Sequence, residues 1–480
     1  MTVDQMLDEA FAHHQAGRLV EAESLYRDAF EADPHRWGAC LNLTKILMLT
    51  GRLEQAQRWL HWRLEDTFED VTAHRQLGFA YASENKLNQA LLHFQRVIDL
   101  DPRDAGAHEI IAHLLRGFGR AEEARTNFDR SAALRDPVQA GYAMGGKPEF
   151  RVLMLFAPGG GNTPYIYMLR VVHYDCHVLS VVPGVDYDIE QLRASTDVVF
   201  NLIADVDSSA EQLAHVAPLL EKIGKPVINH PDGIAMTGRD SNAGRLARIH
   251  DCVMPMTMRY TSDAMNEAVR EATRDPMAPQ SFGDASQRFG FPLLVRRAGT
   301  HGGEDFDKVD NPPALQRFVE QTQAPHYYVT EYVDYRSHDG YFRKYRFMFV
   351  DGEILPYHLA IDDQWKIHHA TTDMVNQQWM KDEEKAFLDD PHAVFGERQY
   401  AVLRAICDSI HLDYWGVDCG IDRQGRVVVF EANATMLVHT RNELFPYKRP
   451  AVTRIKLAFD AMLERRAALA RLMRGGAAHA

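Results

Sequence analysis

The sequence of 480 residues predicts a multidomain fold, an α-solenoid followed by an α/β and an α+β region. Three observations carry this expectation. Residues 1–136 repeat with a period of 34, a turn-rich segment follows at 137–149, and short apolar runs of strand length alternate with helical patterns after it. A chain of this length exceeds one hydrophobic core, so separate domains are expected.

The repeat consists of four units that align without gaps. A small residue recurs at one position, and a large apolar residue recurs four positions later. The recurring residues are Ala22, Ala56, Ala90 and Ala124, and Tyr26, Leu60, Phe94 and Phe128. Each unit predicts two helices joined at a turn that contains Gly or Asn. The recurring small residue lets the two helices approach closely.

This register resembles the tetratricopeptide repeat (TPR), from about residue 3 to residue 136. The resemblance implies a stacked array with a concave groove, which in that family commonly receives a peptide or another protein. We therefore expect a peptide or protein partner. The alternatives are a dimerisation surface and a rigid spacer.

The segment 137–149, PVQAGYAMGGKPE, predicts a linker because it combines two prolines with three glycines. An α/β subdomain is expected at 150–235, where four apolar runs predict an open, mainly parallel sheet. Those runs are RVLMLFAP, HVLSVVP, DVVFNLIA and KPVINHP. The glycines at 159–161 lack the G-x-G-x-x-G spacing of a dinucleotide loop, so we interpret them as a tight turn.

Composition excludes several classes of protein. The formal net charge of -14 disfavours nucleic acid as a partner, because phosphate binding requires clustered Lys and Arg. No apolar run is long enough to span a membrane, and the first residues lack the features of a signal peptide. The five scattered cysteines favour neither disulfides nor zinc. The expected compartment is the cytoplasm.

The segment GVDCGIDRQGRVVVFEANA predicts two strands joined by a tight turn. Asp418 lies on the first strand, and Glu431 and Asn433 lie on the second. Carboxylate and amide oxygens are the hard ligands that Mg²⁺ prefers when it bridges nucleotide phosphates. These three residues are therefore the candidate metal ligands.

A second motif, FPLLVRRAGTHGGEDF, predicts a strand that ends near Arg296 and a glycine-rich loop after it. The backbone N–H groups of such a loop can bind phosphate oxygens. The candidate cofactor-binding residues of this motif are Arg296, Gly299, Thr300, His301, Gly302 and Gly303.

Together these motifs resemble the ATP-grasp superfamily over residues 151–460, and the nucleotide-binding and catalytic lobes are expected at 236–475, before a flexible tail at 476–480. The resemblance implies ATP and Mg²⁺ as cofactors. It implies that Glu331, Tyr332 and Val333 form the hinge beside adenine. It also implies that Arg346 and Arg245 join Arg296 near the phosphates.

The sequence departs from the family where Arg296 and Arg245 replace lysines, and Arg is a planar fork rather than a compact ammonium. Lys344 likewise stands where an acidic residue is common. We predict Arg296, Arg346 and Arg441 as the catalytic residues. Arg441 would hold a substrate carboxylate, because its planar fork matches that group.

The resemblance implies an ATP-dependent ligase that joins a carboxylate to an amine or another nucleophile through an acyl phosphate. The repeat array would recruit the peptide or protein partner. Two alternatives stay open at this point: a nucleotide-sensing scaffold without turnover, which the replacement of lysine by arginine allows, and a kinase of the same superfamily.

Overall fold

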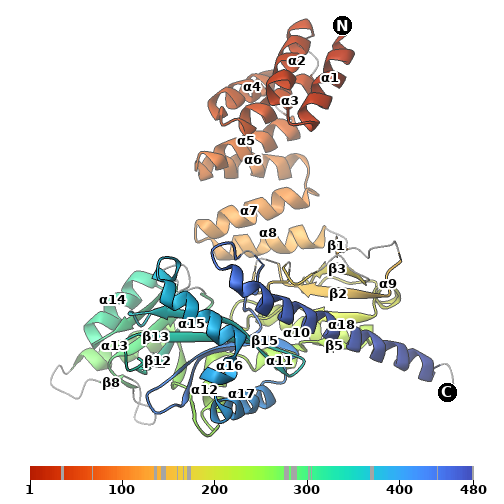
Figure 1. The fold of residues 1–480 in the computed structure, drawn as a ribbon. Helices are drawn as coiled ribbons and strands as arrows, with labels where there is room; N and C mark the ends of the chain where they lie inside the picture. Colours follow the sequence, from red (N-terminus) through yellow and green to blue (C-terminus); the bar gives the residue numbers. More distant parts are fainter. Residues whose placement is uncertain are drawn as a thin grey trace. The chain divides into compact units, whose positions relative to one another are not determined.

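The computed structural model divides into two compact units, Met1–Asp136 and Pro137–Ala480 (Figure 1). The described residues are 1–33, 37–66, 69–134, 138–141, 147–158, 160–165, 167–169, 174–274, 281–282, 289–300, 303, 305–367, 372–440 and 442–477.

The N-terminal unit confirms the four predicted helix pairs. Its helices are α1 (Val3–Gln15), α2 (Leu19–Ala32), α3 (Trp37–Leu49), α4 (Leu53–Asp66), α5 (Val71–Ser83), α6 (Leu87–Leu100), α7 (Ala105–Gly117) and α8 (Ala121–Ala133). The residue in the turn of each pair has a positive φ, which favours Gly or Asn. These residues are Gly17, Gly51, Asn85 and Gly119.

The repeated small residues lie where the paired helices touch. Ala22, Ala56 and Ala90 are fully buried. At Gly78 on α5 a Cβ atom would lie 2.7 Å from the ring of Phe94 on α6, so only glycine fits there without a shift. The alternation of small and large residues in the sequence thus sets the spacing between the helices.

The C-terminal unit begins with the predicted parallel sheet. Its strands are β1 (Val138–Gly141), β2 (Phe150–Phe156), β3 (Tyr174–Ser180), β4 (Val198–Asn201) and β5 (Val227–Ile228), in the order β1-β3-β2-β4-β5. Strands β2 to β5 pair in parallel, and β1 is antiparallel to β3. The helices that connect this region are α9 (Ile189–Ser195), α10 (Ala210–Ile223), α11 (Pro231–Ala235) and α12 (Arg239–Leu246).

A second, antiparallel sheet has the order β11-β10-β12-β7. Its strands are β7 (Thr257–Thr261), β10 (Leu293–Arg297), β11 (Phe306–Val309) and β12 (His326–Glu331). The helices α13 (Ser262–Arg274) and α14 (Pro312–Thr322) accompany it, with a short pair β8 (Ser281–Phe282) and β9 (Phe289–Gly290). Buried side chains of both helices and of the strands share one core.

The third sheet has the order β14-β13-β15-β16-β6. Its strands are β6 (Cys252–Val253), β13 (Phe342–Val350), β14 (Glu353–Asp362), β15 (Tyr414–Ile421) and β16 (Val427–Asn433). The surrounding helices are η1 (Asp373–Val375), α15 (Gln378–Asp389), α16 (Pro391–Val394), α17 (Glu397–Ser409), η2 (Pro446–Lys448) and α18 (Arg449–Ala477).

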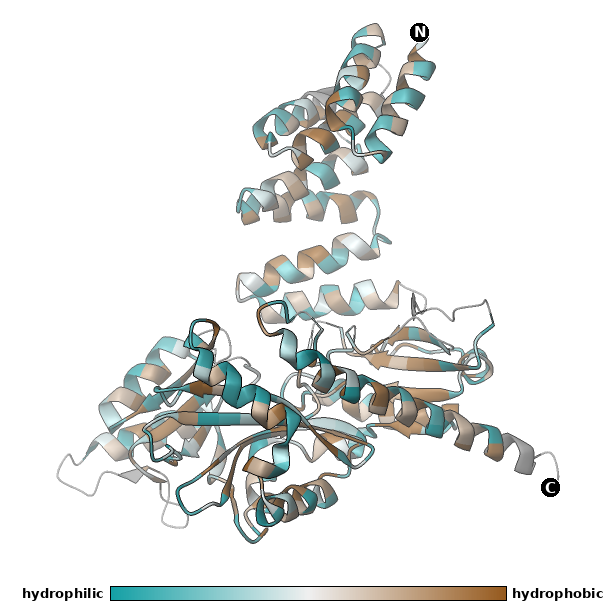
Figure 2. Cartoon of the chain, in the orientation of Figure 1, coloured by the Kyte–Doolittle hydropathy of each residue, from teal (hydrophilic) through white to brown (hydrophobic). Residues whose placement is uncertain are grey.

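Helix α18 packs against β4, β13 and β14, and therefore joins the first sheet to the third. In Figure 2 the strands of the first sheet are mostly brown, whereas α18 alternates between brown and teal. That alternation fits a helix with one buried face, on which Ile455, Phe459 and Met462 are fully buried. Among the described residues, no helix is both long and apolar enough to cross a membrane.

Candidate functional site

A cavity of about 290 Å³ lies among the three sheets of the C-terminal unit. One wall is the segment after β4, a second is the sheet of β10 and β12, and the third is the face of β13, β15 and β16. The charged side chains that line it are Asp205, Asp207, Arg239, Arg296, Glu331, Lys344, Arg346, Lys366, Asp418 and Glu431. Acidic and basic groups are equal in number in this lining.

Strand register places the candidate metal ligands on one face of the third sheet. Asp418 on β15 is directly opposite Glu431 on β16, and Arg346 on β13 is directly opposite Asp418. Asn433 lies two residues after Glu431, so its side chain points to the same face. The hairpin spacing in the sequence therefore brings Asp418, Glu431 and Asn433 together.

Asp418 is almost completely buried and is held by two cations. Arg346 donates to both carboxylate oxygens, at 2.6 and 2.8 Å, and the Nζ atom of Lys344 lies 3.5 Å from the second oxygen. Burial alone would raise the pKa of Asp418, but the positive charges of Arg346 and Lys344 outweigh it and hold the pKa below its ordinary value. The carboxylate is thus ionised at neutral pH.

Glu431 and Asn433 on β16 are linked by a hydrogen bond. One Glu431 oxygen accepts from Arg239 at 2.5 Å and from the side-chain amide of Asn433 at 2.8 Å. The Asn433 oxygen in turn accepts from the backbone N–H and the hydroxyl of Thr435, at 3.0 and 2.9 Å. These bonds fix the direction in which both oxygen donors point.

Arg296 and Lys366 lie on the ring of Phe306. The Arg296 guanidinium carbon is 4.4 Å from the ring centroid, and the Lys366 ammonium is 5.7 Å from it. Both donate to backbone carbonyl oxygens, Arg296 to Thr300 at 3.2 Å and Lys366 to Phe306 at 2.6 Å. Burial, with repulsion from Arg239, lowers the pKa of Arg296 to about 10.

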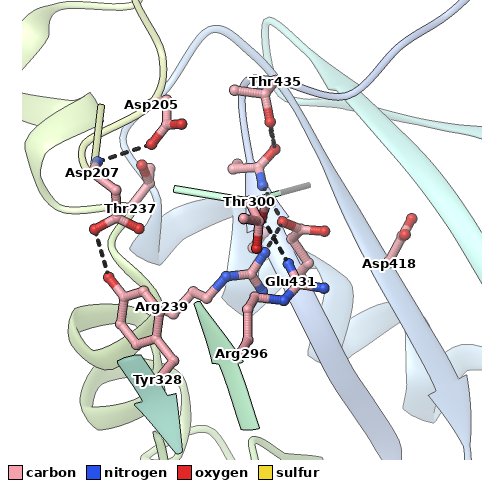
Figure 3. Close-up of polar contacts among 12 residues, drawn as sticks. Asp205, Asp207, Thr237, Arg239, Arg296, Thr300, Tyr328, Asp418, Glu431 and Thr435 are labelled. Carbon is pink, nitrogen blue, oxygen red and sulfur yellow. Dashed lines mark hydrogen bonds and ion pairs between the residues drawn. The ribbon is translucent and has the colours of Figure 1, made fainter. Parts of the chain in front are cut away.

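Asp205 and Asp207 line the cavity, although the sequence did not point to them. Asp205 accepts from the backbone N–H of Asp207 at 2.8 Å, and Asp207 accepts from the hydroxyl of Tyr328 at 2.9 Å (Figure 3). Both follow β4, and polar side chains after parallel strands commonly line a ligand site. This position was the signal available in the sequence.

The remaining candidates are placed as follows. Gly303, Glu331, Tyr332 and Val333 line the cavity. Thr300 is buried and donates to the Arg297 carbonyl, and Gly299 adopts a φ of 78° in the same turn. His301, Gly302 and Arg441 lie outside the described residues.

Arg245 does not line this cavity. It lies on α12, where its guanidinium donates to the Met236 carbonyl at 2.9 Å and to the Asn242 side chain at 2.7 Å. Asn242 in turn donates to the carbonyl of Ala432 on β16. Arg239, six residues earlier on α12, is the arginine of this helix that reaches the cavity.

A buried ionic cluster lies beside Arg346, on the neighbouring strand β14. His358 on β14 is paired with Arg346, and its Nδ1 atom is 2.6 Å from Glu384 on α15. Lys448 lies 2.9 Å from the same Glu384 oxygen, and the hydroxyl of Tyr447 donates to the other oxygen at 2.7 Å. Burial would raise the pKa of Glu384, but the charges of His358 and Lys448 hold it below its ordinary value.

Within the part of the chain that the structure describes, no three His, Cys, Asp or Glu side chains form a metal-binding group. The candidate set at the cavity has two carboxylates and one amide. Such a set matches Mg²⁺, which is commonly bound through one or two carboxylates together with phosphate oxygens.

Comparison with known proteins identifies the N-terminal unit. Residues 13–77 match the family model of the tetratricopeptide repeat. Protein O-mannosyl-transferase Tmtc3 of Drosophila melanogaster is 29% identical over 107 residues, which are 20% of this chain and 12% of that relative. Anaphase-promoting complex subunit 7 of Arabidopsis thaliana is 26% identical over 128 residues, 27% of this chain and 21% of the relative. The chain thus spans about a fifth or less of these relatives.

Similar solved structures include MamA 41-end from Desulfovibrio magneticus RS-1, at 18% identity and a TM-score of 0.26, covering 28% of this chain and 75% of that one. A tetratricopeptide repeat protein from Parabacteroides merdae has the same identity and TM-score, covering 27% and 51%. On the match of the family model and the confirmed helix pairs, the N-terminal unit contains tetratricopeptide repeats.

Proposed function

We propose that the C-terminal unit is an ATP-grasp-type, ATP-dependent ligase that joins a carboxylate to an amine or another nucleophile. One observation carries the proposal: Asp418, Glu431 and Asn433 share one sheet face inside a cavity that also holds five basic side chains. Phosphoryl transfer needs positioning and charge neutralisation more than covalent catalysis by the protein. Oxygen donors beside several cations supply both.

The donor set fits Mg²⁺ bound to nucleotide phosphates. Asp418 and Glu431 accept hydrogen bonds from arginines, which marks them as sites where positive charge is favourable. Asn433 adds a neutral oxygen whose direction is fixed by Thr435. In this arrangement a metal would replace Arg239 on Glu431, which leaves Arg239 available to an anion.

The charges in the cavity indicate where phosphate would bind. Arg239, Lys344 and Arg346 each contact a carboxylate, whereas the hydrogen bonds of Arg296 and Lys366 go to carbonyl oxygens. The positive charges of Arg296 and Lys366 are therefore not neutralised by a hydrogen-bonded carboxylate. We infer that they bind phosphate oxygens, so Lys366 supplies the compact ammonium that Arg296 does not.

When bound, ATP would supply the phosphoryl group that activates a substrate carboxylate. Arg346, held in place by Asp418, would neutralise charge on the transferred group, and Arg441 would hold the carboxylate. The second candidate function is a nucleotide-sensing scaffold without turnover. It is favoured by Arg296, whose guanidinium is already bonded to Thr300 within the loop.

The first test is calorimetry of Mg²⁺-dependent ATP binding to the full chain. Glu431→Gln keeps the size of the side chain and removes one metal-binding charge, so weaker binding in Mg²⁺ is expected. Glu397→Gln is the matched control, because the Glu397 side chain is 87% exposed on α17. Absence of ATP binding to the unaltered protein would reject both the ligase and the nucleotide-sensing scaffold.

Lys366 provides a separate test of the phosphate site. Lys366→Met should weaken binding of ATP more than binding of adenosine, because only ATP carries the phosphates. Lys381→Met is the control, since Lys381 also donates to a carbonyl oxygen, that of Val375 at 3.1 Å, but lies outside the cavity. Product analysis then separates the ligase from a kinase, which would leave a stable phosphorylated product.

We further propose that the repeat array recruits a peptide or protein partner. Phe11 on α1 and Phe79 on α5 occupy the same position in units 1 and 3, and their side chains are 53% and 43% exposed. Large exposed apolar residues at equivalent repeat positions are typical of a binding surface. A protein substrate is first identified by ADP release. Phe79→Ser should then raise the KM for that substrate and leave kcat unchanged, whereas the control variant Leu92→Ser on α6 should change neither.

A further inference from the structure

Four aromatic rings meet between the second and third repeats, on α4, α5 and α6. The Nδ1 atoms of His74 and His93 are 3.0 Å apart, and His61 Nε2 is 2.9 Å from the Tyr81 hydroxyl. The Tyr81 and His93 rings stack with their centroids 5.4 Å apart. This histidine cluster therefore joins three helices through imidazole contacts.

The contact between His74 and His93 requires that one of the two rings be neutral. One Nδ1 must carry the hydrogen and the other must offer a lone pair, because two N–H groups cannot face each other at 3.0 Å. His74 is 4% exposed, so water cannot take over the lost partner. Protonation of both rings would thus remove the hydrogen bond and place two positive charges in contact.

The described environment of His93 opposes a positive charge on its ring. His93 is destabilised as a cation by burial and by His74 and His61, and these effects lower its pKa to about 4. At the start of α6, Lys86 lies 6.0 Å from the Tyr81 ring centroid, and Glu84 is bonded to Lys86. The rings in contact with His93 are the imidazoles of His61 on α4 and His74 on α5 and the phenol of Tyr81 on α5.

The fourth repeat contains the same contact without this sensitivity. His108 and Asn127 lie 34 residues after His74 and His93, and the His108 Nδ1 atom is 2.9 Å from the Asn127 side-chain oxygen. An amide oxygen accepts from a neutral imidazole N–H and, more strongly, from a charged one, so protonation of His108 does not break this contact. The two repeats therefore differ in one ring that can be protonated.

A metal ion is the other ligand that two close imidazoles attract. A stable protein site for zinc usually has three or four ligands, and no third metal-ligating side chain joins the pair within the described residues. The chemistry of the pair thus favours a proton over a metal.

We propose that the third repeat is an acid-sensitive joint, in which double protonation of His74 and His93 opens the contact between α5 and α6 while the fourth repeat stays closed. Because the pKa of His93 is lowered in the folded state, acid lowers the stability of this contact. Stability is complete above about 6.5, the ordinary pKa of histidine, and is lost as the pH falls toward 4.

Hydrogen exchange of the full chain, measured by mass spectrometry from pH 8 to pH 5 and corrected for the intrinsic rate, tests the proposal. Protection of α5 and α6 should fall by up to about 30-fold more than protection of α7 and α8. His93→Asn copies the fourth repeat and should abolish the difference. Asn127→His is the reciprocal variant and should make α7 and α8 acid-sensitive.

Equal pH dependence of the third and fourth repeats in the unaltered protein would overturn the proposal. It would also fail if Asn127→His left α7 and α8 as well protected at pH 5 as before. Neither outcome depends on whether His93→Asn folds, because the reciprocal variant is read in the other repeat.

Discussion

Glu384→Gln tests whether the buried ionic cluster stabilises the third sheet through its charge. Glu384 is fully buried and Lys448 is 2% exposed, so the substitution leaves an ammonium in the core without its carboxylate. Removing one partner of a buried ion pair costs about 3–5 kcal/mol, because the remaining charge stays out of water. We expect a loss of this size in the free energy of unfolding of the C-terminal unit.

The assay is urea unfolding followed by near-ultraviolet circular dichroism. The rings of Phe349 and Trp415 stack at 4.0 Å in the core of the third sheet, so this pair contributes to the near-ultraviolet signal of the folded C-terminal unit. The change in the urea midpoint, multiplied by the slope, gives the lost free energy. Because the pKa of Glu384 is held below its ordinary 4.5, the contribution is complete at neutral pH and is lost as the pH falls below that value.

Glu384→Gln combined with Lys448→Met separates charge from packing. The double variant removes the charges of Glu384 and Lys448 and keeps similar volumes, so it should recover most of the stability that the single variant loses through the unpaired ammonium. If the double variant is as unstable as Glu384→Gln alone, the loss does not come from the unpaired ammonium. The contacts of Glu384 with His358, with the Tyr447 hydroxyl and with the Leu359 N–H would then be the source.

Two further predictions concern packing and hydrogen bonding. Gly78→Ala should destabilise the repeat array by about 1–3 kcal/mol in thermal unfolding, because the new Cβ would overlap Phe94. Gly117→Ala on α7 is the control: its Cβ would meet no atom within 4 Å, so it should be neutral or stabilising. Tyr328→Phe should cost about 1.5–3 kcal/mol in urea unfolding, because Asp207 loses a hydrogen bond; an unchanged midpoint would show that water replaces the hydroxyl.

The sequence predicted the repeat array because its contacts are periodic. Each unit buries the same small residue against the same kind of large one, so a single period of 34 fixes eight helices at once. The strands of the first sheet were predicted for a related reason. Buried parallel strands are continuous apolar runs, which stand out from their surroundings.

The local parts of the candidate site were predicted equally well. Asp418 and Glu431 lie on two strands of one hairpin, so the turn between them determines that they face each other. Arg346 lies beside them because β13 and β15 pair in register, a long-range contact that the spacing of residues does not predict. The resemblance to a known family, rather than the spacing, suggested Arg346.

The contacts that cross from one element to another were not predictable in this way. On α12 the sequence offered two arginines, and Arg245 was the expected ligand of the nucleotide. Helical geometry places the two on different sides, because six residues are about one and two-thirds turns. Arg239 therefore meets Glu431, while Arg245 bonds to Met236 and Asn242.

In the proposed phosphate site, Lys366 compensates for the replacement of lysine by Arg296. Arg296 is partly occupied by the Thr300 carbonyl, but Lys366 lies on the same ring of Phe306 and comes from a loop far along the chain. The proposal therefore assigns the compact ammonium of the phosphate site to Lys366, which lines the same cavity as Arg296. Loss of ATP affinity in Lys366→Met, but not in Lys381→Met, would support this assignment, and equal affinity in both variants would reject it.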